Sequence, residues 1–126
     1  MGPSTTNMYP PPSNTVIQQL KQGVVESISF GKYTIHILFE NGNRLTFSAP
    51  FRFGPTDRLS SLQVNEFPLA ESHLIRILGC PVIDIVCEVD GTLHLRFSND
   101  DALVVYANDP MYEAYTLFVE GHEYVV

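Results

Sequence analysis

Short stretches in which apolar and polar residues alternate make up most of this chain and predict a β-rich protein. Ile35, Ile37 and Phe39 share one face of such a stretch, and residues 93–97 repeat the pattern. A two-residue period is typical of strands that bury one face. Asn41-Gly42 and Asp90-Gly91 are dipeptides that favour tight hairpin turns. The predicted strands cover residues 24–30, 33–40, 44–48, 82–89, 92–98, 102–106, 113–119 and 123–126.

Two short helices are predicted between the strands. The first covers residues 16–22, with Asn14 or Thr15 as its N-cap and Gly23 at its C-terminal end. The second covers residues 70–78 and ends at Gly79. Residues 1–14 are polar and rich in proline, so we expect them to be flexible. Residues 49–54 either continue the preceding strand or form a sheet edge, because Pro50 has no N–H to donate to a ladder.

The second half of the chain resembles the first when residue n is aligned with residue n+58. The alignment needs no gap between residues 16 and 47 and places hydrophobic residues on hydrophobic residues. The positions with identical residues in both halves are Ile17, Leu20, Val24, Thr34, His36, Phe39, Asn41 and Leu45. We therefore predict an internal duplication with pseudo-repeats at residues 15–48 and 73–106.

This pattern predicts a single α+β domain over residues 15–126, made mainly of antiparallel β-structure. Each repeat, a helix followed by three strands, has one apolar face that it cannot bury alone. Two repeats would share one core, either face to face or edge to edge, and the C-terminal hairpin would extend one edge.

Charge is distributed unevenly along the chain, whose net charge is −7. Residues 1–63 carry five basic and three acidic residues, whereas residues 64–126 carry two basic and eleven acidic residues. An acidic surface repels phosphate backbones, so we expect no nucleic-acid partner. It attracts a basic protein partner and speeds the encounter with it. The alternative is that the charge serves solubility alone.

The sequence gives no sign of a membrane-spanning or secretory segment. No apolar stretch reaches the roughly 20 residues of a spanning helix, and the N-terminus lacks a basic region followed by an apolar one. Cys80 and Cys87 are too few for a disulfide framework and lie in or beside an apolar segment. We expect a cytoplasmic protein with reduced cysteines and no membrane partner.

Motifs for catalysis or metal binding are absent from the sequence. There is no G-x-S-x-G, H-E-x-x-H, C-x-x-C or glycine-rich phosphate loop. His36 and His94 occupy equivalent positions of the repeats but have no neighbours at metal-ligand spacing. We expect a protein that is not an enzyme and that needs no cofactor or metal.

Residues 108–115 combine acidic residues with aromatic ones after a proline break. Tyrosine is favoured at protein interfaces because its ring supplies contact area and its hydroxyl a hydrogen bond. The alternative is that a tyrosine anchors a corner of the fold through its hydroxyl. The predicted partner-binding residues are Asp100, Asp101, Asp109, Tyr112, Glu113 and Tyr115.

Three stretches resemble a family of small uncharacterised bacterial proteins. They are Leu78-Gly79, residues 90–97 (DGTLHLRF) and residues 112–115 (YEAY). Where the family pattern has a glycine in the second hairpin turn, this chain has Asp100-Asp101, which leaves the turn type open. Some of these proteins are similar to immunity proteins that neutralise secreted toxins. The resemblance implies a protein partner, here a basic toxin domain, and no catalytic residues.

Two further possibilities remain open from the sequence. One is a small ligand bound at the seam between the repeats, and the other is a homodimer formed through an exposed edge strand.

Overall fold

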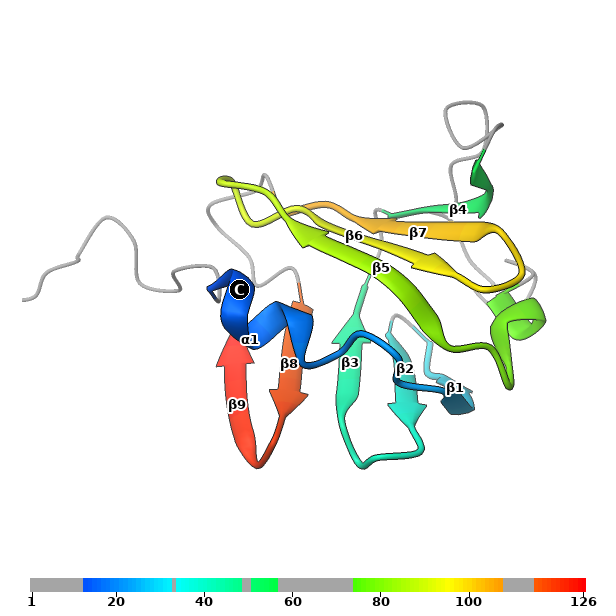
Figure 1. Ribbon diagram of the computed structural model, residues 1–126, viewed down its shortest axis with the longest axis horizontal. Helices are drawn as coiled ribbons and strands as arrows, with labels where there is room; N and C mark the ends of the chain where they lie inside the picture. Colours follow the sequence, from blue (N-terminus) through cyan, green and yellow to red (C-terminus); the bar gives the residue numbers. More distant parts are fainter. Residues whose placement is uncertain (1–12, 33, 49–50, 57–73, 108–114) are drawn as a thin grey trace, which may run out of the picture.

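Two antiparallel sheets face each other in this protein (Figure 1). The computed structural model describes residues 13–32, 34–48, 51–56, 74–107 and 115–126. The first sheet has the strand order β1-β2-β3-β8-β9 and the second β4-β7-β6-β5. The strands are β1 (Val25–Phe30), β2 (Ile35–Phe39), β3 (Arg44–Phe47), β4 (Phe51–Pro55), β5 (Val82–Cys87), β6 (Leu93–Phe97), β7 (Asp101–Val105), β8 (Tyr115–Val119) and β9 (His122–Val125).

The prediction of mainly antiparallel β-structure with little helix is confirmed, and every predicted strand is present among the described residues with small shifts at its ends. The helices are shorter than predicted. α1 covers Asn14–Gln18, and its N-cap is Ser13, whose hydroxyl accepts a hydrogen bond from the Val16 N–H. The second helix is a single 3₁₀ turn, η4 (Leu74–Ile77). Residues 1–12 and 70–73, for which we predicted flexibility and helix, lie outside the described residues.

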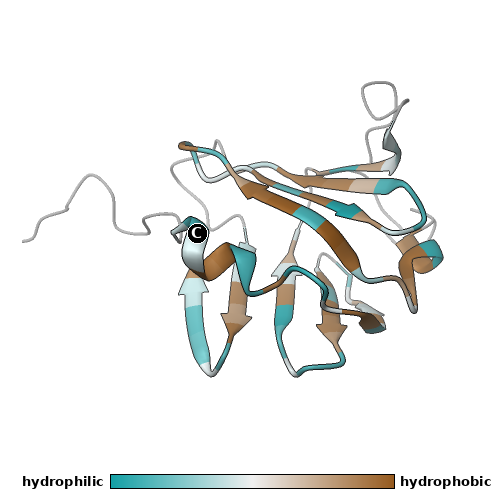
Figure 2. Cartoon of the chain, in the orientation of Figure 1, coloured by the Kyte–Doolittle hydropathy of each residue, from teal (hydrophilic) through white to brown (hydrophobic). Residues whose placement is uncertain are grey.

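A single core lies between the sheets and takes side chains from both. Alternate residues along β2, β3, β6 and β8 are buried, which is the pattern expected of half-buried strands. Figure 2 shows the apolar residues concentrated in the strands and the polar ones in the turns. The rings of Phe47 and Phe51 meet edge to face with centroids 5.2 Å apart, and they join β3 of the first sheet to β4 of the second.

The two halves of the chain meet at a point where their backbones cross symmetrically. Val24 forms an antiparallel bridge with Pro81. The N–H of Val25 donates to the Cys80 carbonyl (3.1 Å), and the N–H of Val82 donates to the Gly23 carbonyl (2.9 Å). The donors Val25 and Val82 are 57 residues apart in the chain, and so are the acceptors Gly23 and Cys80. The two bonds are therefore equivalent, and the contact has approximate twofold symmetry.

The offset between structurally equivalent residues is 57 before the first hairpin and 58 after it. The β1–β2 turn spans residues 31–34 and the β5–β6 turn residues 88–92, which is one residue longer. The ungapped alignment at 58 is therefore wrong for the helices and the first strands. It places the buried Ile17 on Ile75, which is 64% exposed, whereas the equivalent residue at offset 57 is the buried Leu74.

Each half also has a fourth strand that crosses to the other sheet. β4 follows β3 in the chain but pairs with β7, and β8 follows β7 but pairs with β3. The registers match, because Phe51 pairs with Val105 just as Tyr115 pairs with Phe47. Of the two alternatives predicted for residues 49–54, the sheet edge is confirmed for Phe51–Pro55, because β4 is the edge strand of the second sheet, whereas residues 49–50 lie outside the described residues. Each half thus completes the sheet of the other.

Candidate functional site

Three of the six predicted partner-binding residues can be placed. Asp100, Asp101 and Tyr115 are described by the structure, whereas Asp109, Tyr112 and Glu113 lie outside the described residues. The three placed residues belong to the turn before β7, the start of β7 and the start of β8. They do not form one surface, because two of them point into the protein.

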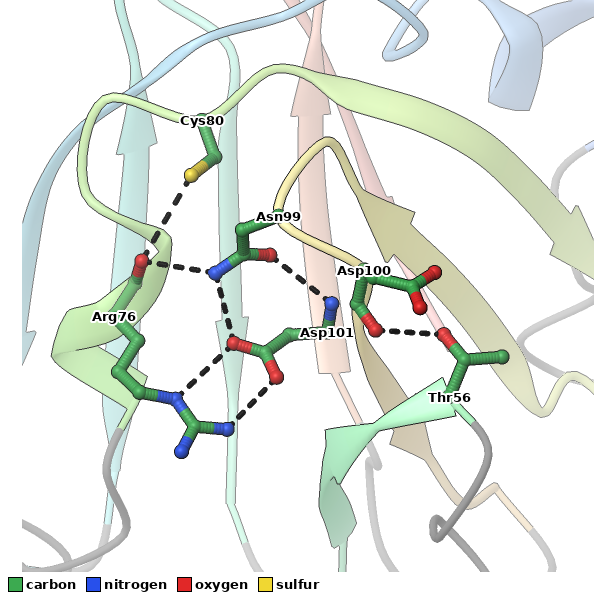
Figure 3. A network of polar contacts seen from close by, with 6 residues as sticks. All are labelled: Thr56, Arg76, Cys80, Asn99, Asp100 and Asp101. Carbon is green, nitrogen blue, oxygen red and sulfur yellow. Dashed lines mark hydrogen bonds and ion pairs between the residues drawn. The ribbon is translucent and has the colours of Figure 1, made fainter.

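Asp101 is buried in a network of polar contacts (Figure 3). Its carboxylate accepts two hydrogen bonds from the Arg76 guanidinium, at 3.2 Å from Nε and 2.7 Å from Nη2. Asn99 donates to the same carboxylate at 2.8 Å. The Arg76 guanidinium also lies over the Phe53 ring, 5.5 Å from its centroid. Asp101 therefore fastens η4 to β7, and its side chain is not available to a partner.

Asp100 lies in the turn between β6 and β7 and is exposed. Its backbone is left-handed, with a φ of +71°, and its carbonyl accepts hydrogen bonds from the backbone N–H (3.0 Å) and the hydroxyl (2.8 Å) of Thr56. Its carboxylate lies 3.8 Å from Arg96. This carboxylate faces solvent, so a role for Asp100 in partner binding stays a prediction.

The side chain of Tyr115 is buried, which favours the alternative hypothesis of a tyrosine that anchors the fold. Its hydroxyl donates to the Gly91 carbonyl at 2.7 Å and lies 3.5 Å from the Cys87 sulfur. Burial raises the pKa of the Tyr115 hydroxyl and also that of the Cys87 thiol, so both groups are held protonated. A neutral, partly buried thiol is a poor nucleophile.

The outward surface of the second sheet, here called the charged face, carries the exposed polar groups of the second half. Its side chains come from neighbouring positions of β4 to β7: Arg52, Asp84, Val86, His94, Arg96, Ala102 and Val104. The small side chains of Ala102 and Val104 lie on the central strand β7, between longer neighbours. They leave a hollow of about 200 Å³ bordered by Asp84, His94 and Arg96. His94 Nε2 forms a hydrogen bond with the carboxylate of Glu88 beside it.

The equivalent surface of the first sheet has a different chemistry. The position of Asp84 is taken by Ser27, that of Val86 by Ser29 and that of Arg96 by Leu38, according to the strand registers. His36 is equivalent to His94, but it bonds the Thr46 hydroxyl at 3.0 Å rather than a carboxylate. The inward faces of the two sheets are alike, and their outward faces are not.

The sequence predicted the strands β5, β6 and β7 of the charged face, but it did not predict the hollow between their side chains. Asp84, His94 and Arg96 were all visible as outward positions of alternating strands. The hollow was not visible, because it depends on the pairing of β6 with β7, which places Ala102 and Val104 beside them.

The described residues include no group of three or more histidine, cysteine or acidic side chains that could hold a metal ion. Within the same part of the chain, no helix has the length and apolar character needed to cross a membrane. Among the described residues that border the hollow, none is a serine or cysteine that could act as a nucleophile beside the His94–Glu88 pair. The arrangement can bind a partner by charge and shape.

Residues 16–126 match a family of unknown function (DUF6188). Neither a curated protein nor a solved structure matches the chain. The resemblance to an uncharacterised family is thus confirmed over most of the chain, and the similarity to immunity proteins stays a prediction.

Proposed function

Since the chain belongs to this family of unknown function, we propose a function from its own surface: it is a non-catalytic protein-binding domain that holds its partner on the charged face. The observation that carries the proposal is the difference between the two sheets. They share a buried framework, yet the second presents Asp84 and Arg96 outward where the first has Ser27 and Leu38. The stability of the fold does not require different side chains on the two outward faces, whereas binding of a partner to one face does.

The charged face itself carries Asp84 with Arg52 and Arg96, and the acidic residues around it, in residues 74–107, favour a basic protein as the partner. Residues 74–107 carry Asp84, Glu88, Asp90, Asp100 and Asp101 against two arginines, and one of these, Arg76, is already paired with Asp101. Complementary charge steers a basic partner to such a surface and aligns it there. A basic toxin domain neutralised by an immunity protein is a partner of this kind, and the internal duplication would have supplied a second sheet free to acquire this role.

The test is direct binding to the product of the neighbouring reading frame. Both proteins are purified and titrated by calorimetry, and the growth of cells that produce the neighbour is compared with and without this chain. We expect a complex and a relief of toxicity. A neighbour that neither binds nor harms the cell would contradict the proposal.

A matched pair of variants tests the charged face. Asp84→Lys reverses a charge on it, and Ser27→Lys introduces the same side chain at the equivalent position of the first sheet. We expect Asp84→Lys to weaken binding of a basic partner by about tenfold or more and Ser27→Lys to change it by less than about twofold. Equal effects of the two variants on binding would show that the binding surface does not lie on the second sheet.

The hollow on the charged face supports small-ligand binding as the second candidate function. At about 200 Å³ it is smaller than most ligand pockets, which span roughly 300–1,000 Å³. It lies within one sheet and not at the seam, where backbone hydrogen bonds join residues 22–25 to residues 79–82. Asp84 and Arg96 would suit a small molecule with both charges. Chemical-shift changes at these residues on titration with free amino acids would favour this candidate.

A further inference from the structure

The turn between β5 and β6, residues 88–92 and here called the hairpin tip, differs in length from its counterpart between β1 and β2. It is the place where the second half is one residue longer than the first. Val89 stands at this tip with 99% of its surface exposed, and Val86, on the strand below, is 48% exposed. An aliphatic side chain so exposed has no role in the core.

Hydrogen bonds hold the hairpin tip in one shape. The N–H of Glu88 donates to the Thr92 carbonyl at 2.8 Å, and the N–H of Gly91 donates to the Glu88 carbonyl at 2.9 Å. The Asp90 carboxylate accepts from the Thr92 N–H at 2.9 Å. From inside the protein, the Tyr115 hydroxyl donates to the Gly91 carbonyl. Because the turn is already ordered, a partner that binds it loses little conformational entropy.

Negative charge surrounds the exposed valine. Glu88 and Asp90 flank it in the chain, and Asp84 lies on β5 below it. Between Arg76 and Arg96 the sequence contains no lysine or arginine. Hydrogen bonds from Thr92 lower the pKa of Asp90, so this carboxylate keeps its charge in mildly acidic solution. An apolar centre with a charged rim is the usual arrangement of a protein interface.

We propose that the hairpin tip is the anchor of the partner-binding surface: Val89 enters an apolar pocket of a basic partner, whose lysine or arginine side chains meet Glu88 and Asp90. This inference rests on the proposed function and makes it more specific, because it names the element that the partner contacts first. The extra residue of the second half is then the feature that converts a framework turn into a binding element.

The test compares two apolar-to-polar variants of the full chain. Val89→Ser removes the anchor, and Ile75→Ser makes the same kind of change at another exposed aliphatic residue, 64% exposed on η4. The probe is the purified product of the neighbouring reading frame, titrated by calorimetry into each variant. We expect Val89→Ser to raise Kd about tenfold or more and Ile75→Ser to change it less than about twofold. Both variants should melt at the wild-type temperature, because neither side chain is buried.

A second pair tests the charged rim. Glu88→Gln should weaken binding, and more strongly at 50 mM than at 300 mM salt, because screening already weakens the attraction at high salt. Glu123→Gln, at an exposed position of β9, should leave Kd unchanged.

The outcomes separate this inference from the proposed function. If the product of the neighbouring reading frame binds the wild type and Val89→Ser equally well, the proposed function stands and the proposal that Val89 is the anchor is wrong. If the neighbour binds but is acidic, or if Glu88→Gln and Glu123→Gln behave alike, the charged rim is wrong. If the neighbour does not bind the wild type, both the proposed function and the anchor are wrong.

Discussion

At the scale of single residues, two equivalent turns require the same backbone but carry different side chains. Gly42 precedes β3 with a φ of +91°, and Asp100 precedes β7 with a φ of +71°. In both turns the preceding asparagine side chain accepts a hydrogen bond from the N–H two residues further on, from Asn43 (3.0 Å) and from Asp101 (3.0 Å). The turn type that Asp100-Asp101 left open in the sequence is therefore the same left-handed turn that Gly42 forms.

This equivalence predicts opposite effects for two substitutions. Asp100→Gly relieves the steric strain of a left-handed aspartate and should raise the free energy of unfolding by roughly 0.5–1 kcal/mol. Gly42→Asp introduces the same strain and should lower it by about 1 kcal/mol, since a Cβ added at Gly42 meets no atom within 4 Å and only the backbone matters. Urea unfolding of both variants measures the effects. If both change stability in the same direction, the strain argument fails.

The Arg76–Asp101 pair contrasts with the ion pair between Arg96 and Asp100. Arg76→Ala leaves the carboxylate of Asp101, whose side chain is 8% exposed, without its main partner. We expect the free energy of unfolding to fall by roughly 2 kcal/mol, less than for a fully buried pair because Arg76 itself is half-exposed. Arg96→Ala is the control, since its partner faces solvent, and should cost less than about 0.5 kcal/mol. Equal losses in urea unfolding would contradict this account.

At the scale of elements, Tyr115 connects β8 to the hairpin tip across the fold. Tyr115→Phe keeps the buried ring and removes the hydrogen bond to the Gly91 carbonyl. We expect a loss of roughly 1 kcal/mol in the free energy of unfolding, because that carbonyl loses its buried donor. Amide hydrogen exchange should become faster at residues 90–92 and stay unchanged in the turn at residues 41–43. Unchanged exchange at the hairpin tip would show that Tyr115 does not hold it.

The sequence was informative about elements whose pattern is local and less so about those set by distant contacts. The strands followed from alternation such as Leu93, Leu95 and Phe97, and most turns followed from Asn-Gly and Asp-Gly. The sequence did not reveal the offset of 57. Ile75 is identical to Ile17, but the folded chain shows that Leu74 is the buried residue equivalent to Ile17. The role of Tyr115 was open for the same reason, since its hydrogen-bond partner lies 24 residues away.

The candidate site also combines features that were visible in the sequence with features that depend on distant contacts. The acidic character of the second half was visible in the sequence, and the structure places Asp84 and Glu88 on or beside the charged face. Asp101 was a reasonable candidate by charge alone, but its pairing with Arg76 is a contact between distant parts of the chain. Val89 attracted no attention, because it was the last residue of the predicted strand at residues 82–89, whereas β5 ends at Cys87 and leaves Val89 exposed.

At the scale of the whole molecule, the crossing of β4 and β8 makes the two halves mutually dependent. Each of these strands pairs with the third strand of the other half. A chain divided within residues 57–73 should therefore give two fragments that are unfolded alone and fold when mixed, because each supplies a strand that the other lacks. Circular dichroism and size-exclusion chromatography of the fragments, alone and mixed, measure this. A fragment that folds alone would contradict the account.

The same crossing determines how this chain must fold as it is synthesised. β3 leaves the ribosome before β4 to β7, but the strand that covers its edge, β8, begins only at Tyr115. At roughly 5–20 residues per second, the nascent chain waits several seconds with that edge unpaired. An open edge of this kind is a template for pairing with another chain. Ribosomes that stall before residue 115 should therefore release aggregation-prone products, and chaperone demand should be highest before β8 is made.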